Sequence, residues 1–204
     1  MAASRSSRRL YRQAEPGIPV KSAEAIKALK ATCERAAKVL DEMVQAVEVG
    51  VTTYDLDRLG KKVMDSLGVE SACFGYPGSN RPFPAYTGIS VNHEVVHGIG
   101  DLNCVIKEGD VVSLDVVVSY EGYIGDNART VLVGEASPED QKLVDTTREA
   151  LNKGIEKAIS GNRIGDISAT IQKFVEKAGF SVIREFVGHG VGESMHEPPQ
   201  IPNF

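Results

Sequence analysis

Asp115 and Asp126 are spaced so that both side chains could bind the same metal ion. Glu121-Gly122 stands between two apolar runs, which predicts the two-residue turn of a β-hairpin. The register of that turn places Val117 opposite Asp126, so Asp115 lies on the same face and diagonal to Asp126. Diagonal positions lie about 7–8 Å apart at the backbone, within reach of one shared cation. Because two carboxylates repel each other unless a cation lies between them, the spacing predicts a metal site.

Asp115 by itself also has a simpler interpretation, as a charge that protects a valine-rich edge strand from aggregation. It shares its face of the strand with Ser113 and Ser119, and the face carrying Val112 and Leu114 is the expected core side. This interpretation does not require Asp126 on the same face. We therefore favour metal binding by the pair.

The four histidines form two groups, His93 with His97 and His189 with His196. His93-Glu-Val-Val-His97 matches the H-E-x-x-H zinc motif, which brings both imidazoles to one face only on a helix. The surroundings are β-branched and Gly98 follows at once, so we favour a non-helical segment over a helical zinc site. His189 lies among glycines that let backbone and ligand approach closely. Taken singly, each histidine is more often a surface or core residue than a catalytic group.

These residues must be positioned by helices and strands that the apolar spacing outlines. We expect helices over 22–50, 54–67, 138–159 and 166–179, and strands over 89–91, 111–120, 123–133 and 180–187. A loop rich in glycine, proline and aromatic residues covers 73–87.

The two helical pairs repeat each other. Gly50, Asp55 and Gly68 recur as Gly161, Asp166 and Gly179, each 111 residues later. Such a repeat predicts two α/β halves packed about a pseudo-twofold axis rather than two independent domains. The same offset would place the second copy of the hairpin beyond Phe204, so we expect the second half to be incomplete.

The composition excludes several classes of protein. With 204 residues, 42% hydrophobic and 25% charged, the chain resembles an ordinary globular protein. Its longest apolar run, residues 111–120, is too short to cross a bilayer, so we expect no membrane span. Three cysteines without a C-x-x-C pair favour a reducing compartment, and we expect a cytoplasmic protein. The sequence contains neither a G-x-S-x-G elbow nor a nucleotide-binding P-loop.

Residues 1–21 are expected to form a flexible basic tail ahead of one domain over 22–204. The tail contains Arg5, Arg8, Arg9 and Arg12, whereas the rest of the chain is acidic and the whole carries a net charge of −5. This distribution disfavours a general nucleic-acid-binding protein. The tail is either a solvated terminus or a contact for the ribosome, RNA or an import receptor.

The combined motifs resemble type I methionine aminopeptidases, which remove the initiator methionine from nascent proteins. The matching segments are Ile89-Ser-Val-Asn-His-Glu-Val-Val-His97-Gly-Ile, Asp110-Val-Val-Ser-Leu-Asp115-Val, Gly125-Asp126, Gln172-Lys-Phe-Val-Glu176, Arg184-Glu-Phe-Val-Gly-His189-Gly-Val-Gly192 and His196-Glu-Pro-Pro-Gln200. The resemblance runs from about residue 22 to the last residue and implies the α+β pita-bread fold with two pseudo-twofold α/β halves. Its duplicated halves agree with the internal repeat.

The resemblance implies a role for five residues. Asp115, Asp126 and His189 correspond to three of five ligands of a paired divalent-metal site. Asp126 would bridge two ions, Asp115 would bind one and His189 the other. His97 and His196 correspond to histidines that contact substrate: His97 would orient the amino-terminal end, and His196 would stabilise the tetrahedral intermediate. The two divalent ions could be cobalt, manganese, iron or zinc.

The resemblance also implies a pocket for the methionine side chain, lined by Cys73, Tyr76 and Phe83. His93 matches no functional position of the family. The other two ligands of the family are glutamates downstream of the second histidine, and no residue up to Phe204 fills their places. We therefore expect the chain as given to bind metal weakly and to be impaired.

The expected function is release of the N-terminal methionine of nascent peptides by a monomeric enzyme. The alternative is a non-catalytic binding module (a pseudoenzyme) on the same fold. Retention of all five metal- and substrate-site residues counts against it, because a binding module has no physical need for them. A proline-directed peptidase of the same fold would need other pocket residues than Cys73-Phe-Gly-Tyr76.

Overall fold

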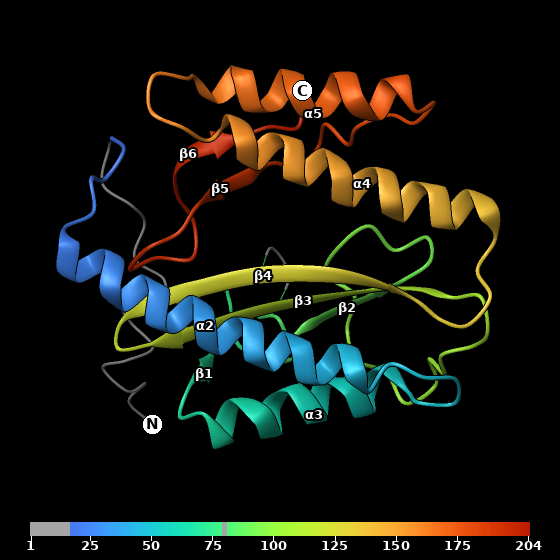
Figure 1. Ribbon diagram of the computed structural model, residues 1–204. Coiled ribbons are helices and arrows are strands. Elements are labelled where there is room, and N and C mark those ends of the chain that lie inside the picture. Colours follow the sequence, from blue (N-terminus) through green and yellow to red (C-terminus); the bar gives the residue numbers. More distant parts are fainter. Residues whose placement is uncertain (1–16, 79–80) are drawn as a thin grey trace. The chain divides into compact units, whose positions relative to one another are not determined.

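The structure, a computed structural model, describes residues 17–78 and 81–204 (Figure 1). The arginines of the expected basic tail, at positions 5, 8, 9 and 12, lie outside the described residues. The chain divides into two compact units. The first comprises the chain up to Ala136 together with Val191–Glu197, and the second comprises Ser137–Gly190 and Pro198–Phe204.

The first unit begins with helix α2 (Ala23–Gln45). The Ser22 hydroxyl caps it by accepting the Ala25 N–H at 3.1 Å, as its position predicts. The helix ends at Gln45 rather than at Gly50, so the expected end is wrong by five residues. The Gly50 N–H donates to the Ile106 carbonyl oxygen at 2.9 Å, because this segment turns back to the loop ahead of the hairpin instead of continuing the helix.

Helix α3 (Thr53–Ser66) lies within one residue of the expected helix. Thr52 and Asp55 form a capping box: the Thr52 hydroxyl accepts the Asp55 N–H at 3.0 Å, and the Asp55 carboxylate accepts the Thr52 N–H at 3.3 Å. Gly68 follows the helix with a φ of +65°, where a residue without a side chain is unstrained.

The sheet of the first unit is antiparallel and is built around one long strand. Strands β1 (Glu70–Ser71) and β2 (Gly88–Val91) pair with different parts of β3 (Val111–Tyr120), and β4 (Tyr123–Leu132) pairs with its whole length. The expected hairpin and its register are confirmed, with Val117 opposite Asp126. The turn residues Glu121 and Gly122 both have positive φ, as a two-residue hairpin turn requires.

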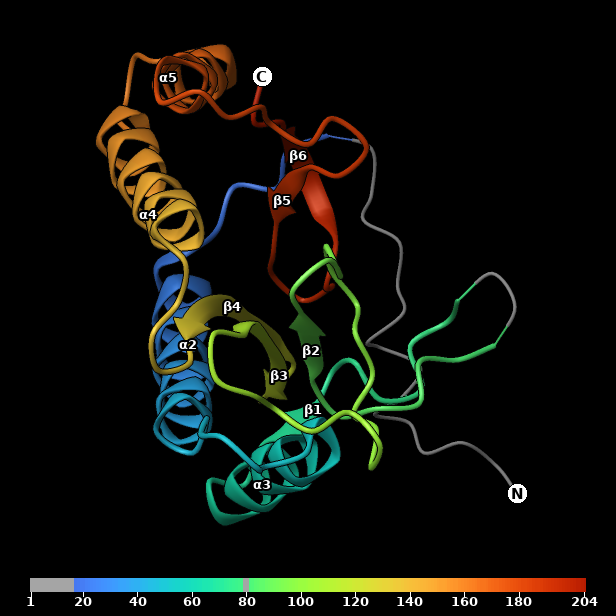
Figure 2. The same ribbon diagram turned by 90° about the vertical axis from the view of Figure 1, so that its right-hand side faces the viewer.

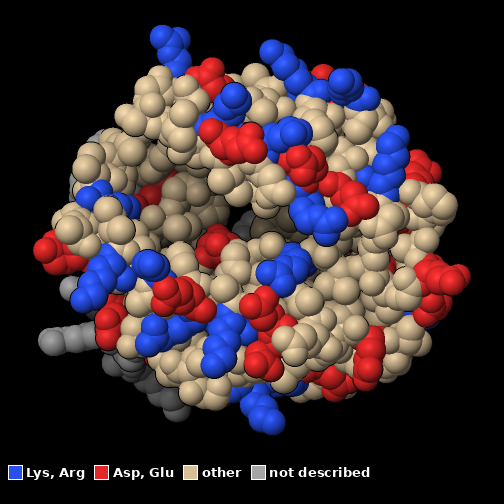
Figure 3. All heavy atoms as spheres, in the orientation of Figure 1, with Lys and Arg blue, Asp and Glu red and all other residues tan. Residues whose placement is uncertain are grey.

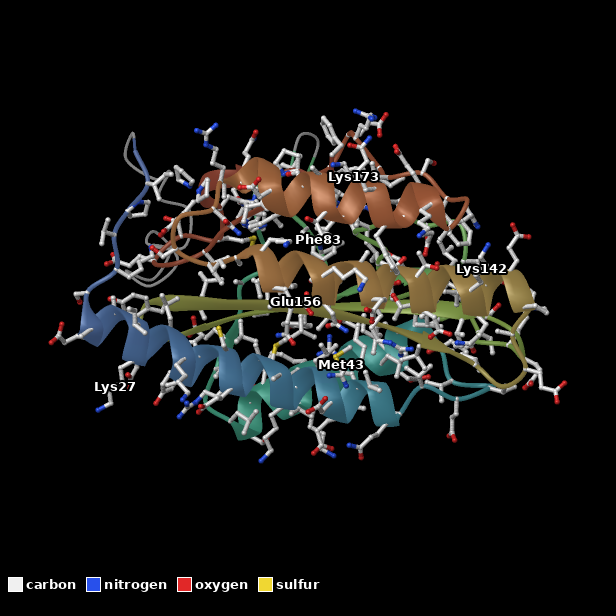
Figure 4. All side chains as sticks on the ribbon, turned by 45° about the horizontal axis from the view of Figure 1, so that its top comes forward. Lys27, Met43, Phe83, Lys142, Glu156 and Lys173 are labelled. Atoms are coloured by element: carbon white, nitrogen blue, oxygen red, sulfur yellow. The ribbon has the colours of Figure 1, made fainter. Side chains whose placement is uncertain are left out.

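The core of the first unit lies between the sheet and the two helices. Helix α2 packs on β3 and β4, and α3 packs near β1 and β2 (Figure 2). Lys27 points outward from α2, whereas Met43 of the same helix is fully buried (Figure 4). The core face of β3 presents side chains that are all fully buried: Val112, Leu114, Val116 and Val118. Strand alternation therefore turns Asp115 to the opposite face.

The second unit contains helices α4 (Pro138–Lys157) and α5 (Ile164–Lys177). It also contains strand β5 (Gly188–Gly190) and, apart from its first residue, strand β6 (Glu197–Ile201), and the two strands pair. The Ser137 hydroxyl caps α4 by accepting the Asp140 N–H at 3.1 Å. Helix α4 packs on α5 where Gly154 leaves room for Ile171.

The expected strand over residues 180–187 is wrong. Residues 180–187 are neither helix nor strand, because they have no partner strand, and Ile183 and Phe186 are 45% and 47% exposed. Strand β6 was not predicted because Pro198 and Pro199 lie within it, and proline has no N–H to donate to a sheet hydrogen bond.

The repeat is also seen in the bounds of one helix of each pair. Both bounds of α5 lie 111 residues after the bounds of α3. None of the described helices is long and apolar enough to span a membrane. On the face shown in Figure 3, acidic and basic side chains are intermixed.

Candidate functional site

Asp115 and Asp126 lie on one face of the hairpin at diagonal positions, as the sequence predicts. Asp115 pairs with Ala128, and Asp126 pairs with Val117 two residues along β3. Both carboxylates are half-buried on the face away from the helices. The described structure thus places two anionic groups side by side, where a cation would relieve their repulsion.

Gly88 makes room for Asp115 on the neighbouring strand, a feature that sequence reasoning missed. It lies opposite Asp115 on β2, and a Cβ atom at Gly88 would lie 3.1 Å from the Asp115 Cβ. A larger residue would press on the carboxylate. The only signal in the sequence is a glycine at the start of an apolar strand, which has meaning once the pairing of β2 with β3 is known.

A small apolar cluster adjoins the aspartate pair. Val117 and Ile124 share the face of the hairpin with the carboxylates and pack with Ala72 and Met195. Cys73, Tyr76 and Val191 pack against this cluster. The described residues therefore place an apolar surface beside the two acids, with Cys73 and Tyr76 as parts of it.

The Cys73 thiol is held in its protonated form. Burial, with the negative charges of Asp115 and Asp126 beside it, raises the pKa of the Cys73 thiol to about 12. A protonated thiol is neither a nucleophile nor a metal ligand at neutral pH. Cys73 is therefore a small, uncharged side chain close enough to both carboxylates for their charges to affect it.

Tyr76 and His196 are brought together although they lie 120 residues apart. The Tyr76 hydroxyl lies 2.7 Å from Nδ1 of His196, and the two rings meet edge to face with centroids 5.5 Å apart. His196 follows the buried Met195 and precedes Glu197, whose carboxylate pairs with the Lys21 ammonium. The backbone on both sides of His196 is thus anchored in the first unit.

Phe83 is joined to Tyr76 and Gly75 by backbone hydrogen bonds within the loop. The Gly75 N–H donates to the Phe83 carbonyl oxygen, and the Phe83 N–H donates to the Tyr76 carbonyl oxygen, both at 2.8 Å. The buried Asp57 carboxylate fixes the end of the same loop by accepting the N–H groups of Tyr86 and Thr87, each at 2.9 Å. Nothing near Asp57 in the sequence signals this role, because its partners lie 29 and 30 residues away.

His97 is exposed and lies in a tight, non-helical segment. Its φ is +62°, and the following Gly98 packs so closely on β2 that a Cβ atom would lie 2.0 Å from the Ile89 carbonyl oxygen. Residues 93–97 contain no helix, which confirms that the H-E-x-x-H match is not a helical zinc motif. His93 is exposed.

His189 lies in β5 of the second unit and is half-buried. Its Nδ1 lies 3.0 Å from the Gly190 carbonyl oxygen. Because a carbonyl oxygen only accepts, Nδ1 carries the proton and Nε2 is the nitrogen able to bind a metal ion. An imidazole oriented in this way by a backbone carbonyl is typical of metal sites.

Carboxylates and an imidazole suit first-row divalent ions, so the donor types fit a metal centre. Within residues 17–78 and 81–204, no group of three or more acidic, histidine or cysteine side chains is gathered closely enough to hold a metal ion. The ligand set of Asp115, Asp126 and His189 therefore stays a prediction.

A separate cavity of about 380 Å³ lies at the end of β2. Its lining includes His93, Glu94 and Asp110 but neither of the paired aspartates. The Asp110 and Glu94 carboxylates accept the N–H groups of Lys107 and Val91. Both carboxylates of this cavity therefore stabilise local turns of the backbone.

Residues 27–204 match metallopeptidase family M24. The chain is 43% identical over 188 residues to the methionine aminopeptidase of Aquifex aeolicus, which covers 91% of this chain and 73% of that protein. It is 44% identical over 167 residues to the methionine aminopeptidase of Clostridium acetobutylicum, which covers 82% of this chain and 65% of that protein. The crystal structure of methionine aminopeptidase from Thermotoga maritima is similar with a TM-score of 0.87 and 43% identity, covering 92% of this chain and 74% of that chain. The chain thus spans 65% to 74% of the length of these three relatives.

Proposed function

Because this chain belongs to metallopeptidase family M24 and to its methionine aminopeptidases, we propose that it removes the N-terminal methionine from nascent polypeptides. It has the pita-bread fold of that family. The observation that carries the proposal is the diagonal pair Asp115 and Asp126 beside an apolar cluster that includes Cys73 and Tyr76. Paired carboxylates next to an apolar surface suit a reaction at the end of a peptide that carries an apolar side chain.

We propose that Asp115, Asp126 and His189 would hold divalent metal ions. Such ions, when bound, lower the pKa of a water molecule and polarise the scissile carbonyl. Support comes from the shared face of the two aspartates and from the Nδ1 contact that directs Nε2 of His189 to act as the ligand.

The histidines of the first unit would act on the substrate. His97 is exposed, and the tight packing of Gly98 fixes its backbone, which suits a group that orients the amino-terminal end of the peptide. His196 would donate a hydrogen bond to the developing oxyanion of the tetrahedral intermediate. Cys73, Tyr76 and Phe83 would line the pocket for the methionine side chain.

We further propose that the domain over residues 22–204 acts in the cytoplasm as a monomer and that the basic tail contacts the ribosome. No observation favours the binding-module alternative.

The experiment is single-turnover release of methionine from a Met-Gly peptide, with protein in excess and with manganese or cobalt added. Asp126→Asn should lower the rate at least about a hundredfold, because bound ions contribute several kcal/mol to such reactions. Asp41→Asn is the matched control, since Asp41 is exposed on α2 and pairs with Arg129. Equal rates for wild type and Asp126→Asn would overturn the proposal.

A further inference from the structure

The contact between Tyr76 and His196 joins two anchored segments of the first unit. The Tyr76 N–H donates to the Cys73 carbonyl oxygen at 2.9 Å, and the Tyr76 carbonyl oxygen accepts from Phe83 at 2.8 Å. Met195, next to His196, is 8% exposed and packs in the same apolar cluster as Tyr76. Because both backbones are held, the side-chain hydrogen bond of 2.7 Å can fix the orientation of the imidazole at low entropic cost.

Either ring could donate in this contact, and their acceptor strengths favour the phenol of Tyr76 as the donor. A phenol oxygen is a weak acceptor because its lone pairs are delocalised into the ring, whereas an unprotonated imidazole nitrogen is a strong acceptor. The neutral imidazole can accept at Nδ1, and its single proton then lies on Nε2. The edge-to-face contact of the rings holds the imidazole plane in this orientation.

We propose that Tyr76 is a positioning residue that holds His196 in the tautomer with its proton on Nε2. This inference rests on the proposed function of His196 as a donor to the oxyanion. An imidazole in the other tautomer would present a lone pair at Nε2 and would repel the oxyanion. Tyr76 therefore has a second task besides lining the pocket, since it supplies the correct tautomer for catalysis.

Nitrogen-15 NMR of the histidine side chains reads the tautomer directly and without catalysis. In wild type, His196 should show a protonated Nε2 and an unprotonated Nδ1, with its signals assigned by their loss in His196→Gln. In Tyr76→Phe, the signals should move toward a mixture of both tautomers. Tyr120→Phe is the matched control, because Tyr120 stacks against Arg35 away from this contact and its loss should leave His196 unchanged.

Methionine release gives the second readout. Tyr76→Phe should lower kcat about two- to tenfold, the effect of losing one ordinary hydrogen bond, with KM nearly unchanged. If Tyr76 only lined the pocket, KM would rise and the tautomer would not change. A protonated Nδ1 in wild type, or unchanged nitrogen signals in Tyr76→Phe, would overturn the inference.

The two readouts separate this inference from the proposed function. Absence of methionine release by wild type would contradict the proposed function, while the NMR experiment would still decide the tautomer. Release by wild type with unaltered nitrogen signals in Tyr76→Phe would contradict only the positioning role. Equal thermal unfolding of Tyr76→Phe and wild type would exclude loss of folding as the cause.

Discussion

The helix pairs α2–α3 and α4–α5 repeat the same landmarks at a constant offset, yet they bury their apolar side chains very differently. Leu40 of α2 is 2% exposed, whereas Leu151, at the equivalent position of α4, is 57% exposed. One turn further along, Val44 packs against the core of the first unit, and its counterpart Ile155 is 60% exposed. The same helical pattern therefore has two different packing environments.

The difference lies in the sheet. Helix α2 packs on β3 and β4, whereas the extensive contacts of α4 are with α5. Apolar spacing and caps are local properties that form a helix in both units. Burial depends on what covers the apolar face, and in the first unit the same sheet carries the two aspartates on its other face. The first unit thus combines a packed core with most of the predicted site.

The largest expected effect separates the two equivalent leucines. Leu40→Ala should lower the free energy of unfolding by about 3 kcal/mol, because it leaves a cavity in a packed core. Leu151→Ala should change it by less than about 0.5 kcal/mol, because the side chain is largely exposed. Urea denaturation followed by circular dichroism measures both variants, and each serves as the control for the other.

Equal losses of unfolding free energy in the two leucine variants would contradict the different burial of Leu40 and Leu151. Such a result would mean that the apolar face of α4 is covered in solution as closely as that of α2. A small loss for Leu40→Ala alone would instead contradict the packing of α2 on the sheet.

A smaller effect distinguishes the caps of α3 and α5. Thr52→Ala should lower the free energy of unfolding by about 1 kcal/mol, because the Thr52 hydroxyl caps α3. Arg163→Ala should be nearly neutral, because an arginine side chain has no acceptor and the Arg163 side chain makes no capping bond. Thermal unfolding of both variants checks this, and an equally large loss for Arg163→Ala would contradict it.

Local signals predicted the parts of the fold that depend on neighbours in the chain. The two-residue turn at Glu121-Gly122 fixed the hairpin register, and capping residues fixed the starts of α2 and α4. Prediction failed where pairing with distant segments decides the structure. Residues 180–187 have strand-like composition but no partner, and β6 contains two prolines, which disfavour strands.

The candidate site shows the same division. The shared face of Asp115 and Asp126 followed from turn geometry, because both lie on one hairpin. The contact of Tyr76 with His196 could not be predicted, since it joins segments 120 residues apart. Gly88 was missed for the same reason, because its role depends on the pairing of β2 with β3. Spacing in the sequence predicts which side chains share one face of the hairpin. Tertiary pairing determines which residues surround them.

The most direct test of the account is a calorimetric titration of manganese or cobalt into wild type, Asp115→Asn, Asp126→Asn and the double variant. If both carboxylates hold the same ions, each single variant should bind at least about tenfold more weakly than wild type. The loss of binding free energy in the double variant should then be smaller than the sum of the losses in the two single variants, because the first substitution already disrupts the shared site. Wild-type affinity in Asp126→Asn, or strictly additive losses, would contradict a metal centre on this hairpin.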